Sequence, residues 1–136
     1  KVKAKAERVK HTADKLRIKP KAKWLAELQA IVNMIVRLRD KNDFCASCDK
    51  GPGWDGQWHA GHYYSRGHSS SLRFNLKQCS VCNNHLSGNI GEYTPKLILK
   101  IGQVKLDYLT AHKSDIRSYD VEWIKRAIKI ARKGVK

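Results

Sequence analysis

Cys45-Ala46-Ser47-Cys48 and, thirty residues further along, Cys79-Ser80-Val81-Cys82 contain all four cysteines of this 136-residue chain. Two such C-x-x-C pairs in one domain supply the four thiolates of a tetrahedral zinc site, with Zn–S bonds of roughly 2.3 Å. Protein then occupies every position around the metal, so we expect the zinc to be structural. Two disulfides or a redox dithiol are the alternative interpretations. The first requires an oxidising compartment, of which the sequence carries no signal, and the second leaves one pair unexplained.

The segment between the two pairs is longer than a compact zinc ribbon needs. Such ribbons place about 15 to 20 residues between their pairs, whereas residues 49–78 number thirty. The segment is dense in histidine, glycine, tryptophan and tyrosine, a composition that suits a site better than a connector. We therefore expect a functional site to be built between the cysteine pairs.

The chain is strongly basic, with 28 Lys and Arg against 12 Asp and Glu and a formal net charge of +16. Ten of the basic residues lie in residues 1–23 and six in residues 123–136. Solvated helix faces explain any single lysine, but two terminal clusters together favour nucleic acid as the partner. A membrane is disfavoured, because the longest apolar stretch, residues 30–36, is interrupted by Asn33 and is too short to span a bilayer.

The length allows one domain with a modest core. We expect a basic N-terminal arm over residues 1–20, disordered or a frayed helix, and a single zinc-stabilised domain over residues 21–136. Because the chain begins at Lys1 and its only methionine is Met34, we also expect residues upstream. Apolar spacing over residues 20–38 predicts a helix of about five turns, whose apolar face is core or, as second choice, a dimer seam.

Helix signals also follow the second cysteine pair. Thr94-Pro95 predicts an N-cap and the first turn of a helix, and Gly102 predicts a break in it. Ser118 or Asp120 would cap a last amphipathic helix. The C-terminal helices are thus expected over residues 94–133.

Between the cysteine pairs, residues 57–64 and 72–76 predict two strands. The second pair then starts a short helix that runs through Leu86 and ends at Ser87-Gly88-Asn89. Strand, loop, strand and helix make a ββα unit, over about residues 45–90, that zinc holds at both ends. The predicted fold class is α+β: a zinc-bound ββα-metal core with flanking amphipathic helices, mostly helical overall.

The same unit contains groups that phosphodiester hydrolysis requires. Cleavage at neutral pH needs a base for the attacking water and a cation that neutralises charge on the phosphate and the departing oxygen. An imidazole titrates at about pH 6.5, so His62 is a credible base, although a polar strand residue is the plainer interpretation. Asn83 follows Cys82, and adjacent helical residues point about 100° apart. One helical turn can therefore hold zinc on one side and present an oxygen to a second metal on the other.

These residues resemble known nucleases. His62, Asn75 and Asn83, with two C-x-x-C pairs around them, resemble the ββα-metal fold of HNH endonucleases. More closely, the chain resembles the NinG/Rap recombination endonucleases of lambdoid phages, with weaker similarity from about Pro20 through the helices after Tyr93. The motifs that carry this resemblance are Gln57-Trp58-His59-Ala60-Gly61-His62-Tyr63, Leu72-Arg73-Phe74-Asn75, Gln78-Cys79-x-x-Cys82-Asn83 and Ser87-Gly88-Asn89.

The resemblance implies a metal-dependent, structure-specific endonuclease that cuts branched DNA, namely Holliday junctions and D-loops. It implies a homodimer in the cytoplasm of the bacterial host, and products with 5′-phosphate and 3′-hydroxyl ends. His62 would be the general base, Asn75 would steady the loop between the strands, and Asn83 would be a ligand of a catalytic Mg²⁺ or Mn²⁺. The four cysteines would hold the structural Zn²⁺.

Further side chains flank this site. Arg66, Arg73 and Lys77 would contact phosphates beside the scissile bond, with ordinary surface charge as the alternative. His68 and His85 could also reach a metal, although a loop or surface position is the simpler interpretation of each.

The chain departs from the family pattern at His59, where the family has aspartate. An imidazole is a poorer ligand than a carboxylate for Mg²⁺ and a better one for Mn²⁺, so His59 as a ligand predicts a preference for Mn²⁺. In a regular strand His59 and His62 point to opposite faces, and their convergence needs a bulge that Gly61 would permit. The substitution also keeps open a zinc-stabilised DNA-binding module without cleavage. An HNH nuclease that acts on linear duplex DNA is a further alternative.

Overall fold

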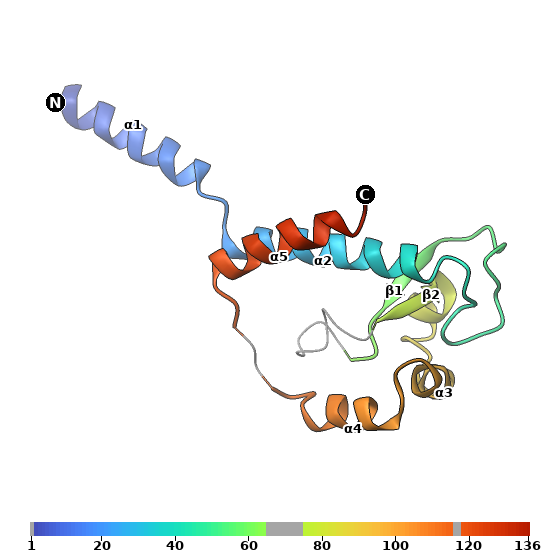
Figure 1. Ribbon diagram of the computed structural model, residues 1–136. Coiled ribbons are helices and arrows are strands. Elements are labelled where there is room, and N and C mark those ends of the chain that lie inside the picture. Colours follow the sequence, from blue (N-terminus) through green and yellow to red (C-terminus); the bar gives the residue numbers. More distant parts are fainter. Residues whose placement is uncertain (1, 65–74, 116–117) are drawn as a thin grey trace.

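The computed structural model describes residues 2–64, 75–115 and 118–136, the side chains of residues 13–17 excepted (Figure 1). Six helices and two short strands follow one another in this described part. Their order is α1 (Val2–Arg17), α2 (Lys21–Arg39), β1 (Trp58–Gly61), β2 (Leu76–Cys79), η2 (Val81–His85), α3 (Ile90–Ile101), α4 (Gln103–Ala111) and α5 (Val121–Lys133). The expected α+β class, mostly helical with a small sheet, is confirmed.

Helix α1 contains the basic arm and projects away from the remaining elements (Figure 1). Residues 2–12 are all exposed, and the mean hydropathy of the helix is too low for a buried face. Over residues 2–12 the arm is therefore a helix with no buried side chain. None of the helices among the described residues has the length and apolarity needed to cross a bilayer.

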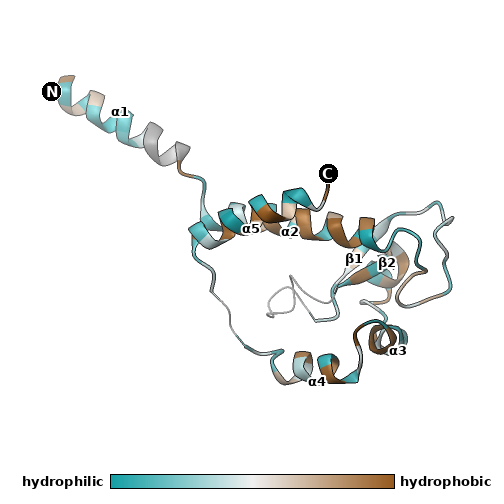
Figure 2. Cartoon of the chain, viewed as in Figure 1, coloured by the Kyte–Doolittle hydropathy of each residue, from teal (hydrophilic) through white to brown (hydrophobic). Residues whose placement is uncertain are grey.

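Helices α2 and α5 pack side by side and form the first hydrophobic core (Figure 1). Leu28 of α2 packs with Ile124 and Ile128 of α5, so the apolar stripe of α2 is core, as expected. The N-cap of α5 is Asp120, whose carboxylate accepts a hydrogen bond from the Trp123 amide at 2.7 Å. In Figure 2, hydrophilic and hydrophobic segments alternate along α5, as in an amphipathic helix.

The two strands pair antiparallel, with Trp58 opposite Cys79 and Gly61 opposite Leu76. The first strand is shorter than the predicted span 57–64. Of the second predicted strand, residues 72–76, the structure confirms Leu76 but not Asn75, and the strand then continues to Cys79. Residues 72–74 lie outside the described part. Residues 76–79 are strand because they pair with β1, and the Lys77 carbonyl also accepts a hydrogen bond from the Ala46 amide at 3.0 Å.

A short helix follows the second cysteine pair, as predicted, but it is wound more widely than an α-helix. The Leu86 amide bonds the Val81 carbonyl at 3.1 Å, five residues back, and η2 is therefore a π-helix. Three consecutive residues with positive φ, Ser87, Gly88 and Asn89, end it. The predicted helix end is confirmed.

The predicted N-cap at Thr94 is wrong. Helix α3 begins at Ile90, four residues earlier, and Pro95 lies inside it. The Thr94 hydroxyl donates to the Ile90 carbonyl at 2.8 Å instead of capping. The predicted break at Gly102 is confirmed, because this glycine separates α3 from α4 with φ at 84°, a conformation that side chains disfavour. Helices α3 and α4 bury a second core whose members include Ala46, Leu76, Tyr93, Leu97, Leu106 and Leu109.

Candidate metal centre and active site

The fold brings the four cysteines together. The Sγ atoms of Cys45, Cys48, Cys79 and Cys82 all lie within 4.8 Å of one another. A tetrahedron with Zn–S bonds of roughly 2.3 Å has sulfur–sulfur edges of about 3.8 Å, and Cys48 Sγ lies 3.7 Å from Cys79 Sγ. The four thiols are therefore close enough to hold a metal ion such as zinc.

Backbone amides support this thiol cluster. The amides of Ser47 and Cys79 donate to Cys45 Sγ at 3.4 and 3.3 Å, and the Cys82 amide donates to Cys79 Sγ at 3.4 Å. Such bonds favour a thiolate. Burial acts in the opposite direction, since it raises the pKa of the Cys45 thiol and raises that of Cys82 to about 12. A cation is therefore needed to keep these buried sulfurs deprotonated at neutral pH.

A buried amide ties the helix end to the hairpin. Gln78 is fully buried, and its Nε2 donates to Ser47 Oγ at 2.7 Å and to the Gly88 carbonyl at 2.5 Å. A Cβ at Gly61 would lie 2.3 Å from Gln78 Oε1. Gly61 is thus required by close packing against Gln78.

Two predicted ligands of the second metal are in contact. Asn83 Nδ2 lies 3.0 Å from Nδ1 of His59, and both side chains are partly buried. An amide nitrogen can only donate, so the imidazole nitrogen accepts. His59 belongs to β1 and Asn83 to η2, and Cys82 beside Asn83 belongs to the thiol cluster. The arrangement places the pair directly next to the candidate zinc site.

The other two predicted catalytic residues lie next to Gly61 and Leu76, the last residue pair of the hairpin. His62 follows the end of β1 and has both ring nitrogens shielded from water, and Asn75 precedes β2 and is buried. The Leu76 amide donates to the Tyr93 hydroxyl at 2.8 Å, and this hydroxyl donates to the Gly61 carbonyl at 2.8 Å. Tyr93 therefore holds the backbone next to both residues.

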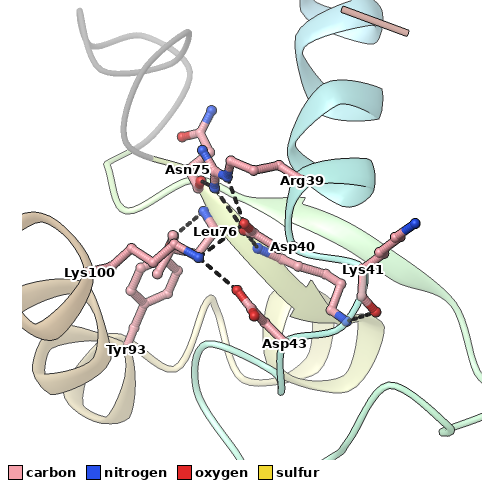
Figure 3. A network of polar contacts seen from close by, with 9 residues as sticks. Arg39, Asp40, Lys41, Asp43, Asn75, Leu76, Tyr93 and Lys100 are labelled. Carbon is pink, nitrogen blue, oxygen red and sulfur yellow. Dashed lines mark hydrogen bonds and ion pairs between the residues drawn. The ribbon is translucent and has the colours of Figure 1, made fainter. Parts of the chain in front are cut away.

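A charged network holds the start of β2 from the other side (Figure 3). Arg39 Nη2 donates to the Asn75 carbonyl at 2.6 Å, and its guanidinium also pairs with Asp40. Asp40 Oδ2 accepts from the Lys77 amide at 3.0 Å, and Lys100 Nζ lies 3.3 Å from Asp40 Oδ1. Burial opposes ionisation of Asp40, but the hydrogen bonds from Arg39 and the Lys77 amide outweigh it and hold the pKa of this carboxyl below its usual range.

The predicted phosphate contacts are placed differently. The Lys77 side chain is buried, with Nζ 3.3 Å from the Lys41 carbonyl and 4.1 Å from the centre of the Trp58 ring. A phosphate contact by Lys77 would require the release of both interactions. Arg66 and Arg73 lie outside the described residues, as does His68, whereas His85 is exposed at the end of η2.

Comparison with known proteins identifies the family. The whole chain, residues 1–136, matches the family described as bacteriophage lambda NinG protein. The chain belongs to the NinG family. It is 41% identical over 102 residues to protein ninG of Escherichia phage lambda, covering 72% of this chain and 49% of that protein. Protein ninG of Salmonella phage P22 is 40% identical over 104 residues, covering 73% of this chain and 50% of that protein. This NinG-family chain thus spans about half the length of the curated relatives it matches, and no solved structure matches it.

Sequence reasoning missed the residues of this NinG-family chain that hold the hairpin. Two signals were available. Asp40 is an acid at the C-terminal end of a helix whose last turn carries Arg37 and Arg39, where a negative charge opposes the helix dipole. Tyr93 is a residue with a polar tip on an apolar helical stripe that continues at Leu97 and Ile101.

Proposed function

We propose that this NinG-family chain is a structure-specific endonuclease that hydrolyses phosphodiester bonds in branched DNA, such as Holliday junctions and D-loops. One observation carries the proposal: His59 and Asn83 are held 3.0 Å apart between a strand and a helix that the cysteine cluster ties together. His62 follows the same strand. The net charge of +16 fits a polyanionic substrate.

The donor set of the pair suits an exchangeable divalent cation. His59 would supply an imidazole nitrogen and Asn83 an amide oxygen, once the amide is turned. The cation would neutralise charge on the scissile phosphate and on the departing oxygen. Because imidazole is a poor ligand for Mg²⁺, we expect higher activity with Mn²⁺.

The chain itself supplies the remaining roles. His62 would accept a proton from the attacking water, which requires a movement that uncovers its ring nitrogens, since both are shielded from water in the structure. Asn75 would keep the backbone before β2 in place. The 3′ oxygen would depart, which leaves 5′-phosphate and 3′-hydroxyl ends. Two copies of the chain would present two such sites to a four-way junction, as expected of a homodimer.

A specific observation favours a second function. The resemblance implies aspartate at the position of His59, and the Nδ1 of His59 lies 3.0 Å from Asn83 Nδ2. A zinc-stabilised DNA-binding module without cleavage would use the same fold and charge. A nuclease that acts on linear duplex DNA is the third candidate.

Cleavage of a labelled four-way junction separates these functions. The zinc-loaded chain is incubated with the junction, or with linear duplex of the same sequence, in Mg²⁺, in Mn²⁺ and without added metal. We expect metal-dependent nicks in the junction that His62→Ala slows by about 10² to 10⁴, the range for loss of a general base. His112→Ala, which alters an exposed imidazole paired with Asp115, should cut normally.

Each other outcome selects a different function. Binding without nicks in any metal supports the module. Equal cutting of linear duplex supports the third candidate. Cleavage by His62→Ala at the unaltered rate would remove His62 from the role of base.

A further inference from the structure

A basic groove lies on the helix pair, on elements separate from the hairpin. It has a volume of about 520 Å³ and is lined by Trp24 and Ile128 and by the cations Lys125, Lys129, Arg132, Lys133 and Lys136. Among the residues that the structure describes, no acidic side chain lines it. All five cations are exposed. We refer to this surface as the α5 groove.

The five cations form one row. Their spacing along the chain is 4, 3, 1 and 3 residues, which puts them on one face of α5 and its C-terminal extension. At a rise of about 1.5 Å per residue, its helical part from Lys125 to Lys133 extends over roughly 12 Å, and Lys136 lies after the end of the helix. The row is therefore long enough to follow several phosphates.

Most of this charge is left uncompensated. Arg132 pairs with Glu27 at 2.5 Å, and Lys125 pairs with Glu122 at 3.1 Å. Lys129, Lys133 and Lys136 form no ion pair with any residue in the described ranges. Glu27 is shared, because it also pairs with Lys19. The groove thus carries a surplus of positive charge.

The floor of the groove restrains the first cation of the row, Lys125. Ile128 is buried against α2, and the Trp24 ring has Lys19 Nζ at 3.8 Å and Lys125 Nζ at 5.4 Å from its centre. Cations held beside an aromatic surface are restrained in position. Separate solvated lysines on a convex helix would lack both this floor and the hollow.

We propose that the α5 groove binds the sugar–phosphate backbone of a DNA duplex arm as a second contact, separate from the His59–Asn83 site. One DNA strand carries a phosphate about every 3.4 Å along the axis, so roughly 12 Å of duplex presents about three to four phosphates of one strand to the four cations of α5. The groove residues belong to α2, to α5 and to the residues after it, whereas the hairpin lies beyond the C-terminal end of α2 (Figure 1). The inference rests on the proposed function only in taking DNA as the polyanion.

The salt dependence of binding tests this surface. Affinity of the zinc-loaded chain for a fluorescent linear duplex is measured by anisotropy from 50 to ~300 mM salt without divalent metal, since each phosphate contact contributes about 0.9 to the slope of log affinity against log salt. Lys129→Gln combined with Lys133→Gln should reduce the slope by about 1.8 and weaken binding at least tenfold at ~0.1 M salt. Both side chains are exposed, and a circular dichroism melt checks that the fold persists. Lys129→Arg with Lys133→Arg keeps the charge and should bind normally.

A matched charge change elsewhere supplies the control. Lys105→Gln with Lys113→Gln removes the same charge from exposed positions in and after α4 and should change the slope much less. Equal losses in the two glutamine variants, or no loss in the first, would overturn the proposal. So would a Lys129/Lys133 variant that keeps duplex affinity but loses binding to vesicles of anionic lipid.

If the chain binds duplex through these residues but cuts no junction in any metal, the proposed function fails and the groove stands. If it cuts junctions and the groove variant keeps its KM and duplex affinity, the groove fails alone.

Discussion

Replacing Tyr93 with phenylalanine removes a single oxygen atom from the contact between α3 and the hairpin. That oxygen accepts from the Leu76 amide and donates to the Gly61 carbonyl, both at 2.8 Å. The Ser80 amide bonds the Gln57 carbonyl, and hydrogen-bonded pairs alternate along an antiparallel ladder. Gly61 and Leu76 are therefore at a position where a direct rung would form, and the Tyr93 hydroxyl stands in its place.

The magnitude follows from the groups left behind. Tyr93 is fully buried, so the variant leaves one amide and one carbonyl without a partner unless the strands close on each other. Each buried unpaired group costs about 1–3 kcal/mol, and a direct rung would recover one bond. We expect Tyr93→Phe to lower the free energy of unfolding by about 2–4 kcal/mol. Burial also raises the pKa of Tyr93, so the phenol stays protonated and able to donate at every working pH.

Urea unfolding at fixed free zinc measures this loss, and amide hydrogen exchange locates it. The Leu76 amide should exchange faster in Tyr93→Phe, while amides in the α2–α5 pair should keep their relative order of protection. Tyr108→Phe is the matched control, because the Tyr108 side chain is half exposed and its hydroxyl makes no hydrogen bond among the described residues. Equal stabilities of the two variants, with unchanged protection of the Leu76 amide, would refute the reasoning.

Two further changes probe the network and the metal. Asp40→Asn leaves Arg39 without its ionic partner and should cost about 3 kcal/mol, at the low end for a broken buried pair because Arg39 is partly exposed. The pKa of Asp40 is lower in the folded chain than in the unfolded one. The contribution of this carboxylate to the free energy of unfolding is therefore fully present above the unfolded pKa and is lost as pH falls through the lower folded pKa. Urea unfolding at pH 6 and at pH 8 should thus give the same cost for Asp40→Asn. Removing the metal with a chelator, or weakening its site by Cys48→Ser, should unfold the hairpin region, since structural zinc contributes on the order of 10 kcal/mol. Loss of near-ultraviolet circular dichroism that zinc restores checks this, and an unchanged spectrum would count against a metal site.

The elements that could be predicted from the sequence are those with a repeating local signal. The apolar stripe over residues 20–38 predicted α2, and Asp120 and Gly102 marked a helix start and a break that the structure confirms. The cysteine spacing predicted the thiol cluster in the same way. The residues that determine these helix positions lie within a few positions of one another, and the residues of the cluster are all cysteines, which are recognisable as metal ligands.

One misplaced element, β2, depends on bonds to residues distant in sequence, and the other, α3, depends on the turn that precedes it. Strand β2 has four residues, all buried, and buried strands this short carry no alternation. Its start is fixed by Tyr93 and Asp40, which are far away in sequence and leave no periodic trace. Helix α3 begins before Thr94 because Asn89, with positive φ, is already the residue that precedes its first turn. Thr94 therefore lies inside the helix, and its hydroxyl donates to the Ile90 carbonyl. The preference of Thr94-Pro95 for the start of a helix was overridden by the turn that precedes α3.

A two-stranded sheet is marginal in water without support from other elements. Here the Asn75 carbonyl and the amides of Leu76 and Lys77 are bound by Arg39, Tyr93 and Asp40 respectively. Two of these side chains come from the end of α2 and one comes from α3. These bonds hold the backbone at Asn75 and directly after it, and the Tyr93 hydroxyl also holds the Gly61 carbonyl directly before His62. The position of His62 relative to the His59–Asn83 pair therefore depends on how α2 and α3 pack against the hairpin, and substitutions in either helix should alter activity without touching DNA or metal.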